Sequence, residues 1–269
     1  MLSIGRLGIT SGAEYYLDKV ANNVDDYYLG RGEAPGKWIG TTAEQLGLVG
    51  QVDAESLRNL LAGRSATGDD LGARLCAERR PGYDLTFSAP KGVSLLWAFG
   101  SDHTRERISN AHDRAVGAVL DHLSAEACFV QRGAGGQQLL EANGFIGAAF
   151  RHRTSRAGDP QLHTHVVVPN LVQGADGRWS APDGRHLYTW QKTAGTLYQS
   201  ALRAELAPLG PALAGAAQRS GRAGRHPEEH SAGVLQAPGR HRSGHGRARR
   251  HLCCGGRDGS PRHPGPQAR

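Results

Sequence analysis

The stretch FRHRTSRAGDPQLHTHVVVPN, residues 150–170, decides the fold of this chain. Side chains alternate across a β-strand, so an extended LHTHVVV segment places His163 and His165 on one face and Thr164 on the other. The intervening SRAGDP is rich in turn residues and predicts a hairpin that carries His152 onto the neighbouring antiparallel strand. The three imidazoles would then form one side of a metal site that leaves positions open for a substrate oxygen.

A lone His-x-His pair is weak evidence for a metal, because two surface or hydrogen-bonded histidines are the more common outcome. The hairpin and the third histidine reverse that balance and make a metal site the favoured interpretation. Other histidines of the chain have no such neighbours in the sequence, and we interpret four of them as surface or helix histidines: His103, His112, His122 and His186.

The segments around the hairpin predict a domain of strands and helices. Runs with β-branched or aromatic content, bounded by turn residues, are expected strands at residues 83–88, 145–152 and 162–172. Apolar spacing and helix-stop signals predict helices at residues 53–62, 103–127 and 190–206. Ser88 and Pro90, upstream of the second helix, suit a helix start. Strands interleaved with long helices indicate an α/β or α+β domain.

Asp84 lies inside an apolar strand, in GYDLTFSAPKGVS. A carboxylate at such a position needs a partner, because an unpaired buried charge is costly. It could accept a hydrogen bond from the second nitrogen of a metal-bound imidazole, or it could act as a base toward a tyrosine hydroxyl. An exposed aspartate at a strand end is the plainer alternative.

Two tyrosine pairs lie close to the amino terminus, in EYYLDKVANNVDDYY, residues 14–28. On an uninterrupted helix Tyr16 and Tyr27 share a face, which is what core packing would also produce. Spacing alone therefore favours packing over catalysis. The DDYY context and the distal histidines instead favour catalysis. The sequence identifies the two tyrosine pairs more securely than it identifies the reactive tyrosine within each pair.

The charge of the chain is unevenly distributed. The formal net charge is +7, but residues 211–269 hold eleven Arg, no Lys and three acidic residues, a net of +8 that leaves −1 for residues 1–210. The same segment has no aromatic residue other than histidine and too few apolar side chains to offset its ordering entropy. We expect a folded domain over residues 1–209 and a disordered tail over 210–269, read out of frame or from a degraded gene. A natural basic arm that binds nucleic acid is the alternative.

Several function classes lack support in the sequence. The four cysteines have neither zinc-site nor disulfide-framework spacing, which suits a reducing cytoplasm. No charged leader precedes a long apolar run, and no apolar stretch reaches about 18 residues, so we expect neither secretion nor a membrane role. The Gly-x-x-x-x-Gly-Lys-Ser/Thr pattern is absent, so we do not expect ATP hydrolysis.

Taken together, the motifs resemble the conjugative relaxases of the TrwC/TraI type, the MobF group of HUH endonucleases. The matching segments run in the family's order over residues 1–209: the tyrosine pairs, KWIGTTAEQLGLVGQVD, GYDLTFSAPKGVS, AHDRAV and FRHRTSRAGDPQLHTHVVVPN. The resemblance implies an α+β fold with a central antiparallel sheet and packed helices. It also implies a domain incomplete at its carboxyl end, since relatives continue further, commonly into a helicase.

The implied function is site- and strand-specific nicking and strand transfer at a plasmid transfer origin, through a 5′-phosphotyrosyl intermediate. Tyr15 and Tyr27 map to the catalytic tyrosines, with Tyr16 and Tyr28 as the second choices, and Asp84 maps to the family's carboxylate. A phenol has a pKa of about 10 and needs a base or a cation to act as a nucleophile. The three histidines would hold Mg²⁺ or Mn²⁺, with Zn²⁺ as a further candidate.

The implied partners are single-stranded DNA, a transfer-origin hairpin, and accessory relaxosome and coupling proteins. Phosphate binding calls for basic side chains near the motifs, and our candidates are Lys91, Arg153, Arg156 and Lys192. Two alternatives remain open: a rolling-circle replication initiator or transposase of the HUH class, and a DNA-binding remnant without turnover.

Overall fold

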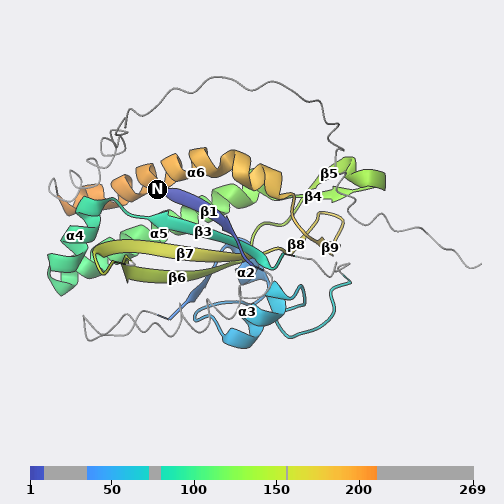
Figure 1. The fold of residues 1–269 in the computed structure, drawn as a ribbon, viewed down its shortest axis with the longest axis horizontal. Coiled ribbons are helices and arrows are strands. Elements are labelled where there is room, and N and C mark those ends of the chain that lie inside the picture. The colour runs from blue at the N-terminus through green and yellow to red at the C-terminus, as the bar shows by residue number, and fades with distance from the viewer. Residues whose placement is uncertain (9–34, 73–79, 156, 211–269) are drawn as a thin grey trace, which may run out of the picture.

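A five-stranded antiparallel sheet forms the centre of the fold (Figure 1). The computed structural model describes residues 1–8, 35–72, 80–155 and 157–210. The strand order is β1-β3-β7-β6-β2, and every neighbouring pair is antiparallel. The strands are β1 (Leu2–Arg6), β2 (Lys37–Ile39), β3 (Gly82–Ser88), β6 (Gly147–Thr154) and β7 (Pro160–Pro169). The expected α+β fold with a central antiparallel sheet is confirmed.

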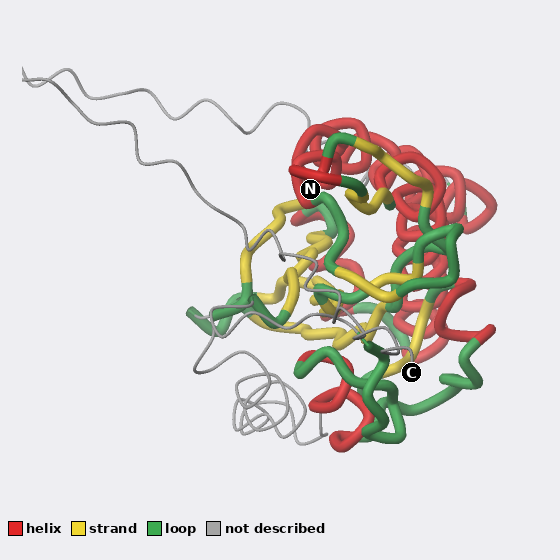
Figure 2. Tube along the Cα trace, turned by 90° about the vertical axis from the view of Figure 1, so that its right-hand side faces the viewer, coloured by secondary structure: helices red, strands yellow, loops and turns green. Residues whose placement is uncertain are grey.

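Helices cover both faces of this sheet (Figures 1 and 2). The long α5 (Asp102–Ala127) and α6 (Gly184–Leu206) pack on one face, where Leu85 and Phe87 of β3 join their apolar side chains in a shared core. On the other face, a second apolar cluster joins α3 (Ala54–Leu61) to part of the sheet. The remaining helical segments of the described residues are α2 (Thr41–Gln45), α4 (Lys91–Phe99) and two short 3-10 turns, Ala134–Gly136 and Ala207–Leu209.

Side-chain caps explain where three helices begin. The carboxylate of Asp53 accepts a hydrogen bond from the Ser56 backbone N–H at the start of α3. Ser101 and Asp183 accept the equivalent bonds at the starts of α5 and α6. The expected helix at 190–206 therefore begins six residues earlier than predicted. Pro90 marks the start of the separate α4 rather than that of α5.

The hairpin of β6 and β7 forms in the predicted register, with His152 opposite His163. Its ends differ from the prediction. Phe145 and Ile146 are buried but precede β6, because they pack into the two cores rather than into the ladder. β7 stops at Pro169, which has no N–H to donate, and Val172 belongs to a separate strand.

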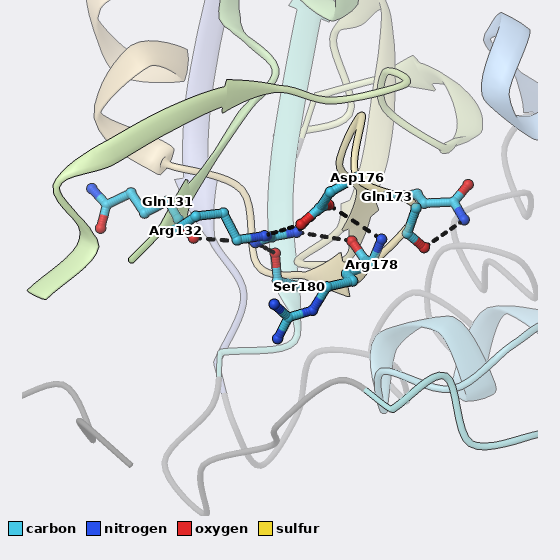
Figure 3. A network of polar contacts seen from close by, with 7 residues as sticks. Gln131, Arg132, Gln173, Asp176, Arg178 and Ser180 are labelled. Atoms are coloured by element: carbon cyan, nitrogen blue, oxygen red, sulfur yellow. Dashed lines mark hydrogen bonds and ion pairs between the residues drawn. The ribbon is translucent and has the colours of Figure 1, made fainter. Parts of the chain in front are cut away.

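Two small antiparallel ladders flank the main sheet: β4 (Phe129–Arg132) with β5 (Gln138–Glu141), and β8 (Val172–Gln173) with β9 (Trp179–Ser180). Arg132 joins them (Figure 3). Its guanidinium donates to both carboxylate oxygens of Asp176 at 2.7 and 3.0 Å, and to Ser180 Oγ at 2.8 Å. The bond from Arg132 holds the pKa of the Asp176 carboxyl at about 2. This network fixes the β8–β9 turn against β4.

Some predictions concern residues outside the described ranges. They are the tyrosine pairs with Tyr15, Tyr16, Tyr27 and Tyr28, the basic residue Arg156, and the tail from residue 211 onward. The domain boundary at residue 209 stays a prediction. Within the described ranges, no helix has both the length and the apolar character needed to cross a membrane.

Candidate metal centre

Three imidazoles meet on the sheet face that lies away from α5. His152 on β6 is the register partner of His163 on β7, and His165 follows on the same face of β7. Each pair of rings has its centroids 5.1 Å apart. One ligand nitrogen from each ring lies within 4.8 Å of the other two. The structure therefore brings together the three histidines on which the sequence argument rests.

Hydrogen bonds at Nδ1 orient two of the rings. Nδ1 of His163 lies 2.9 Å from the carbonyl oxygen of Gln161, which can only accept, so this nitrogen donates. Nδ1 of His165 lies 3.0 and 2.9 Å from the two carboxylate oxygens of Asp84. Both rings then have their lone pair on Nε2. A second hydrogen bond that fixes the tautomer in this way is typical of metal-binding histidines.

Burial keeps the imidazoles in the form that binds metal. Desolvation, followed by the two neighbouring rings, lowers the pKa of His152 from 6.5 to about 3. Desolvation also lowers the pKa of His163. A ligand histidine must be neutral, and these two are neutral near pH 7 without a metal to displace their protons.

One nitrogen of the cluster lacks a hydrogen bond. Nε2 of His152 is buried and has no partner among the described residues. An unsatisfied buried polar atom costs free energy, and a cation held by the three rings would satisfy it. The donor set of neutral imidazoles with a carboxylate behind one of them therefore fits a divalent metal ion.

Asp84 makes the first of the two contacts predicted for it, a hydrogen bond from an imidazole of the cluster. Its side chain is 16% exposed and lies mid-strand, which excludes the exposed strand-end alternative. It accepts from His165, and Thr86 Oγ1 donates to the same carboxylate at 3.3 Å. The carboxylate is thus placed to hold the His165 ring in one orientation. The tyrosines with which it could alternatively work as a base lie outside the described residues.

Comparison with known proteins places the chain in a family. The sequence model described as TrwC relaxase matches residues 9–237. The chain belongs to the TrwC relaxase family. The resemblance seen in the motifs is confirmed, and this family match covers both strands of the histidine hairpin and Asp84.

Relatives of this TrwC-family chain include two multifunctional conjugation proteins TraI. One, from Escherichia coli, is 39% identical over 211 residues, 74% of this chain. The other, from Escherichia coli strain K12, is 36% identical over 222 residues, 78% of this chain. The chain spans only 11% and 12% of their lengths.

Solved structures of the conjugative relaxase TrwC in complex with oriT DNA share the fold. A metal-bound structure matches with a TM-score of 0.67 at 36% identity, covering 78% of this chain and 71% of TrwC. A copper-bound structure matches with a TM-score of 0.66 at 35% identity, with the same coverage of both chains.

The basic residues predicted to bind DNA lie in different places on this relaxase-family fold. Lys91, at the start of α4, donates to the carbonyl of Pro160 at 3.1 Å, and Arg153 follows His152 on β6. Both lie at the end of the sheet that holds the histidines. Lys192 is exposed on α6, on the opposite face of the sheet, so the structure does not bring it to the triad.

The sequence argument missed a buried histidine behind the triad. His112 on α5 is fully buried and lies within hydrogen-bond distance of Thr164 and Tyr198, each at 2.8 Å. The surface alternative for His112 is therefore wrong, although its assignment to a helix holds. The available signal was its place in the AHDRAV motif, between the buried Ala111 and Ala115 of the apolar helix stripe.

Proposed function

We propose that the protein nicks one strand of DNA at a plasmid transfer origin and joins the cut end to one of its own tyrosines. The observation that carries this proposal is the convergence of His152, His163 and His165 beside Asp84, in a chain of the TrwC relaxase family. The TrwC structures that the fold matches are complexes with oriT DNA, and one is metal-bound.

The residues of the centre divide the work between binding and orientation. The three imidazoles would hold the ion, and Asp84 keeps the His165 ring turned so that its Nε2 lone pair points away from β3. A divalent ion bound there would polarise the scissile phosphate and offset the charge that develops on its oxygens. Imidazole donors suit Mn²⁺ or Zn²⁺ better than Mg²⁺, which prefers oxygen ligands.

The proposed nucleophile is Tyr15, with Tyr27 serving a second transfer and Tyr16 and Tyr28 as the alternatives. Its phenolic oxygen forms a bond to the 5′ phosphorus while the bond from phosphorus to the 3′ oxygen breaks. The 3′ oxygen leaves as a hydroxyl, taking up a proton as the phenol gives one up. Because the phosphodiester energy is retained in the tyrosyl link, the cut can be resealed.

We propose single-stranded DNA and the adjoining hairpin as the substrate, with accessory relaxosome and coupling proteins as partners in the cytoplasm. Lys91, Arg153 and Arg156 would bind phosphates near the cut. Lys192, on the other face, would have to contact a different part of the DNA. The near-neutral charge of residues 1–210 requires that such basic groups act locally.

The test uses a labelled single-stranded oligonucleotide carrying an oriT sequence, the full chain and Mn²⁺. A covalent adduct on a denaturing gel, mapped by peptide analysis to Tyr15 or Tyr27, is the expected result. Chelation, or the His163→Ala and His165→Ala double variant, should abolish it. Full activity in that double variant would remove the metal centre from the mechanism.

Parallel incubations separate the alternatives. Cutting of replication-origin oligonucleotides in preference to oriT would assign the chain to replication initiation or transposition. Retention of DNA without any adduct, unchanged by Tyr15→Phe, would make the chain a binding remnant.

A further inference from the structure

The two strands that carry the histidines also make polar contacts on the opposite face of the sheet, where α5 packs. Strand alternation turns Thr164, between His163 and His165, toward the opposite face of the sheet. Arg151, which precedes His152 on β6, points the same way and is the register partner of Thr164. The back face thus has one polar side chain on each ligand strand, at the level of the imidazoles.

Two consecutive residues of α5 engage this pair. His112 Nε2 lies 2.8 Å from Thr164 Oγ1, and Asp113 Oδ2 accepts from Arg151 Nη1 at 2.7 Å. Tyr198 of α6 completes the contact, with its hydroxyl 2.8 Å from His112 Nδ1. His112 and Tyr198 are fully buried and Thr164 is 3% exposed, so water does not compete for the two bonds of His112, whereas the Arg151 and Asp113 side chains are partly exposed.

We propose that His112 and Asp113 are positioning residues that set the spacing of the three metal-binding imidazoles by holding β7 and β6 through Thr164 and Arg151. We call this set of four residues the back brace. The inference rests on the proposed function, because it takes the imidazoles to be metal ligands.

Packing alone does not require these polar groups. The surrounding positions of the α5 interface are filled by apolar side chains such as Val116 and Val166, and a valine in place of Thr164 would keep the same shape. A buried hydroxyl and imidazole are costly unless they are bonded. The hydrogen bonds from α5 are directional, so they fix the position of each strand along the helix.

A metal centre needs that kind of restraint. Ligand distances must hold to within about 0.2 Å, whereas apolar contacts tolerate larger sliding. His163 and His165 flank Thr164 directly, so any shift of the Thr164 backbone moves two of the three ligands. The Asp113 bond to Arg151 restrains the third through the residue next to it.

The test compares Thr164→Val with Ser109→Ala in the full chain. Ser109 lies on the same helix three residues before His112, is 8% exposed, and accepts from Trp97 Nε1 of α4 at 2.9 Å. Each variant removes one buried hydroxyl partner. Titration calorimetry with Mn²⁺ and urea unfolding in chelator are measured for both.

We expect both variants to lose stability, but only Thr164→Val to weaken Mn²⁺ binding, by about tenfold. Thr164→Ser should restore the affinity, because it returns the hydroxyl. His112→Phe added to Thr164→Val should weaken binding by less than about twofold more, since the shared bond is already gone. Equal Mn²⁺ affinities in Thr164→Val and Ser109→Ala would overturn the proposal.

A second measurement does not depend on the metal. Amide hydrogen exchange in the chelated chain should accelerate in β6 and β7 around residues 148–152 and 163–167 in Thr164→Val, and not in Ser109→Ala. If the wild-type chain bound no Mn²⁺, the proposal of a metal centre would be refuted. The exchange rates would still show whether the back brace restrains β6 and β7. Unchanged exchange in Thr164→Val would refute the brace even if the wild-type chain binds metal.

Discussion

The pH dependence of the free energy of unfolding tests whether His112 is buried and neutral behind the metal centre. Its complete burial, reinforced by the charge of Arg151 and by the nearby His163 ring, lowers its pKa from 6.5 to about 3. The native chain therefore keeps this imidazole neutral down to about pH 3, while the unfolded chain protonates it below about pH 6.5. Because the unfolded state binds the extra proton, the free energy of unfolding should fall as the pH drops below 6.5.

The size of the effect follows from the two pKa values. Each pH unit between them is worth about 1.4 kcal/mol, and protonation of the unfolded state is only partial near its own pKa. Between pH 7 and pH 5 the contribution of His112 is then about 2 kcal/mol lost. This is a large fraction of the total stability of a typical domain, about 5–15 kcal/mol.

The assay is urea unfolding at pH 7, 6 and 5 in chelator, for the wild-type chain and His112→Gln. Glutamine has a donor and an acceptor but does not titrate. His152 and His163, whose pKa values are also lowered, contribute to both proteins and cancel in the comparison. We expect the wild-type chain to lose about 2 kcal/mol more than the variant. Equal losses would refute the assignment of a neutral, buried His112.

Three further predictions concern the site and its support. Asp84→Asn should weaken Mn²⁺ binding by about 10- to 100-fold in calorimetry, because it removes the charge behind the His165 ring; an unchanged affinity would contradict that role. Mn²⁺ at about 100 times its dissociation constant should raise the free energy of unfolding by about 2.7 kcal/mol, and the His163→Ala, His165→Ala double variant should show no such rise. Ser94→Ala should cost about 1–3 kcal/mol in urea unfolding, because the buried Leu162 N–H, 3.0 Å from Ser94 Oγ, loses its acceptor; a loss well below 1 kcal/mol would show that another group replaces it.

The histidine hairpin is predictable because it depends on local rules. Period-two alternation, a turn-rich connection and the residue count between His152 and His163 together determine which imidazoles share a face. Asp84 is predictable for a related reason, since a carboxylate among apolar strand residues needs a partner. These arguments require no knowledge of distant packing.

Other parts of the fold depend on contacts that local patterns do not encode. β2 has three residues, too few for an alternation signal, and it joins the sheet only by pairing with β6. The partners of His112 lie 52 and 86 residues away in the chain. The place of His112 in the apolar helix stripe indicates burial, but nothing in the AHDRAV segment identifies Thr164 and Tyr198 as its partners, so only the tertiary arrangement identifies its role.

The neutrality of His152 and His163 has a consequence for DNA binding. These two uncharged rings lie beside the Asp84 carboxylate, and residues 1–210 are near neutral. A divalent ion would change the local charge by two units beside the proposed phosphate site. Metal and phosphate should then bind cooperatively, and coupling of this kind is reciprocal: DNA must tighten the metal by the factor that metal tightens DNA. Fluorescence anisotropy of an oriT oligonucleotide, with and without Mn²⁺, measures one side of that cycle and calorimetry the other. Mn²⁺ that leaves the DNA affinity unchanged would mean that the ion acts elsewhere.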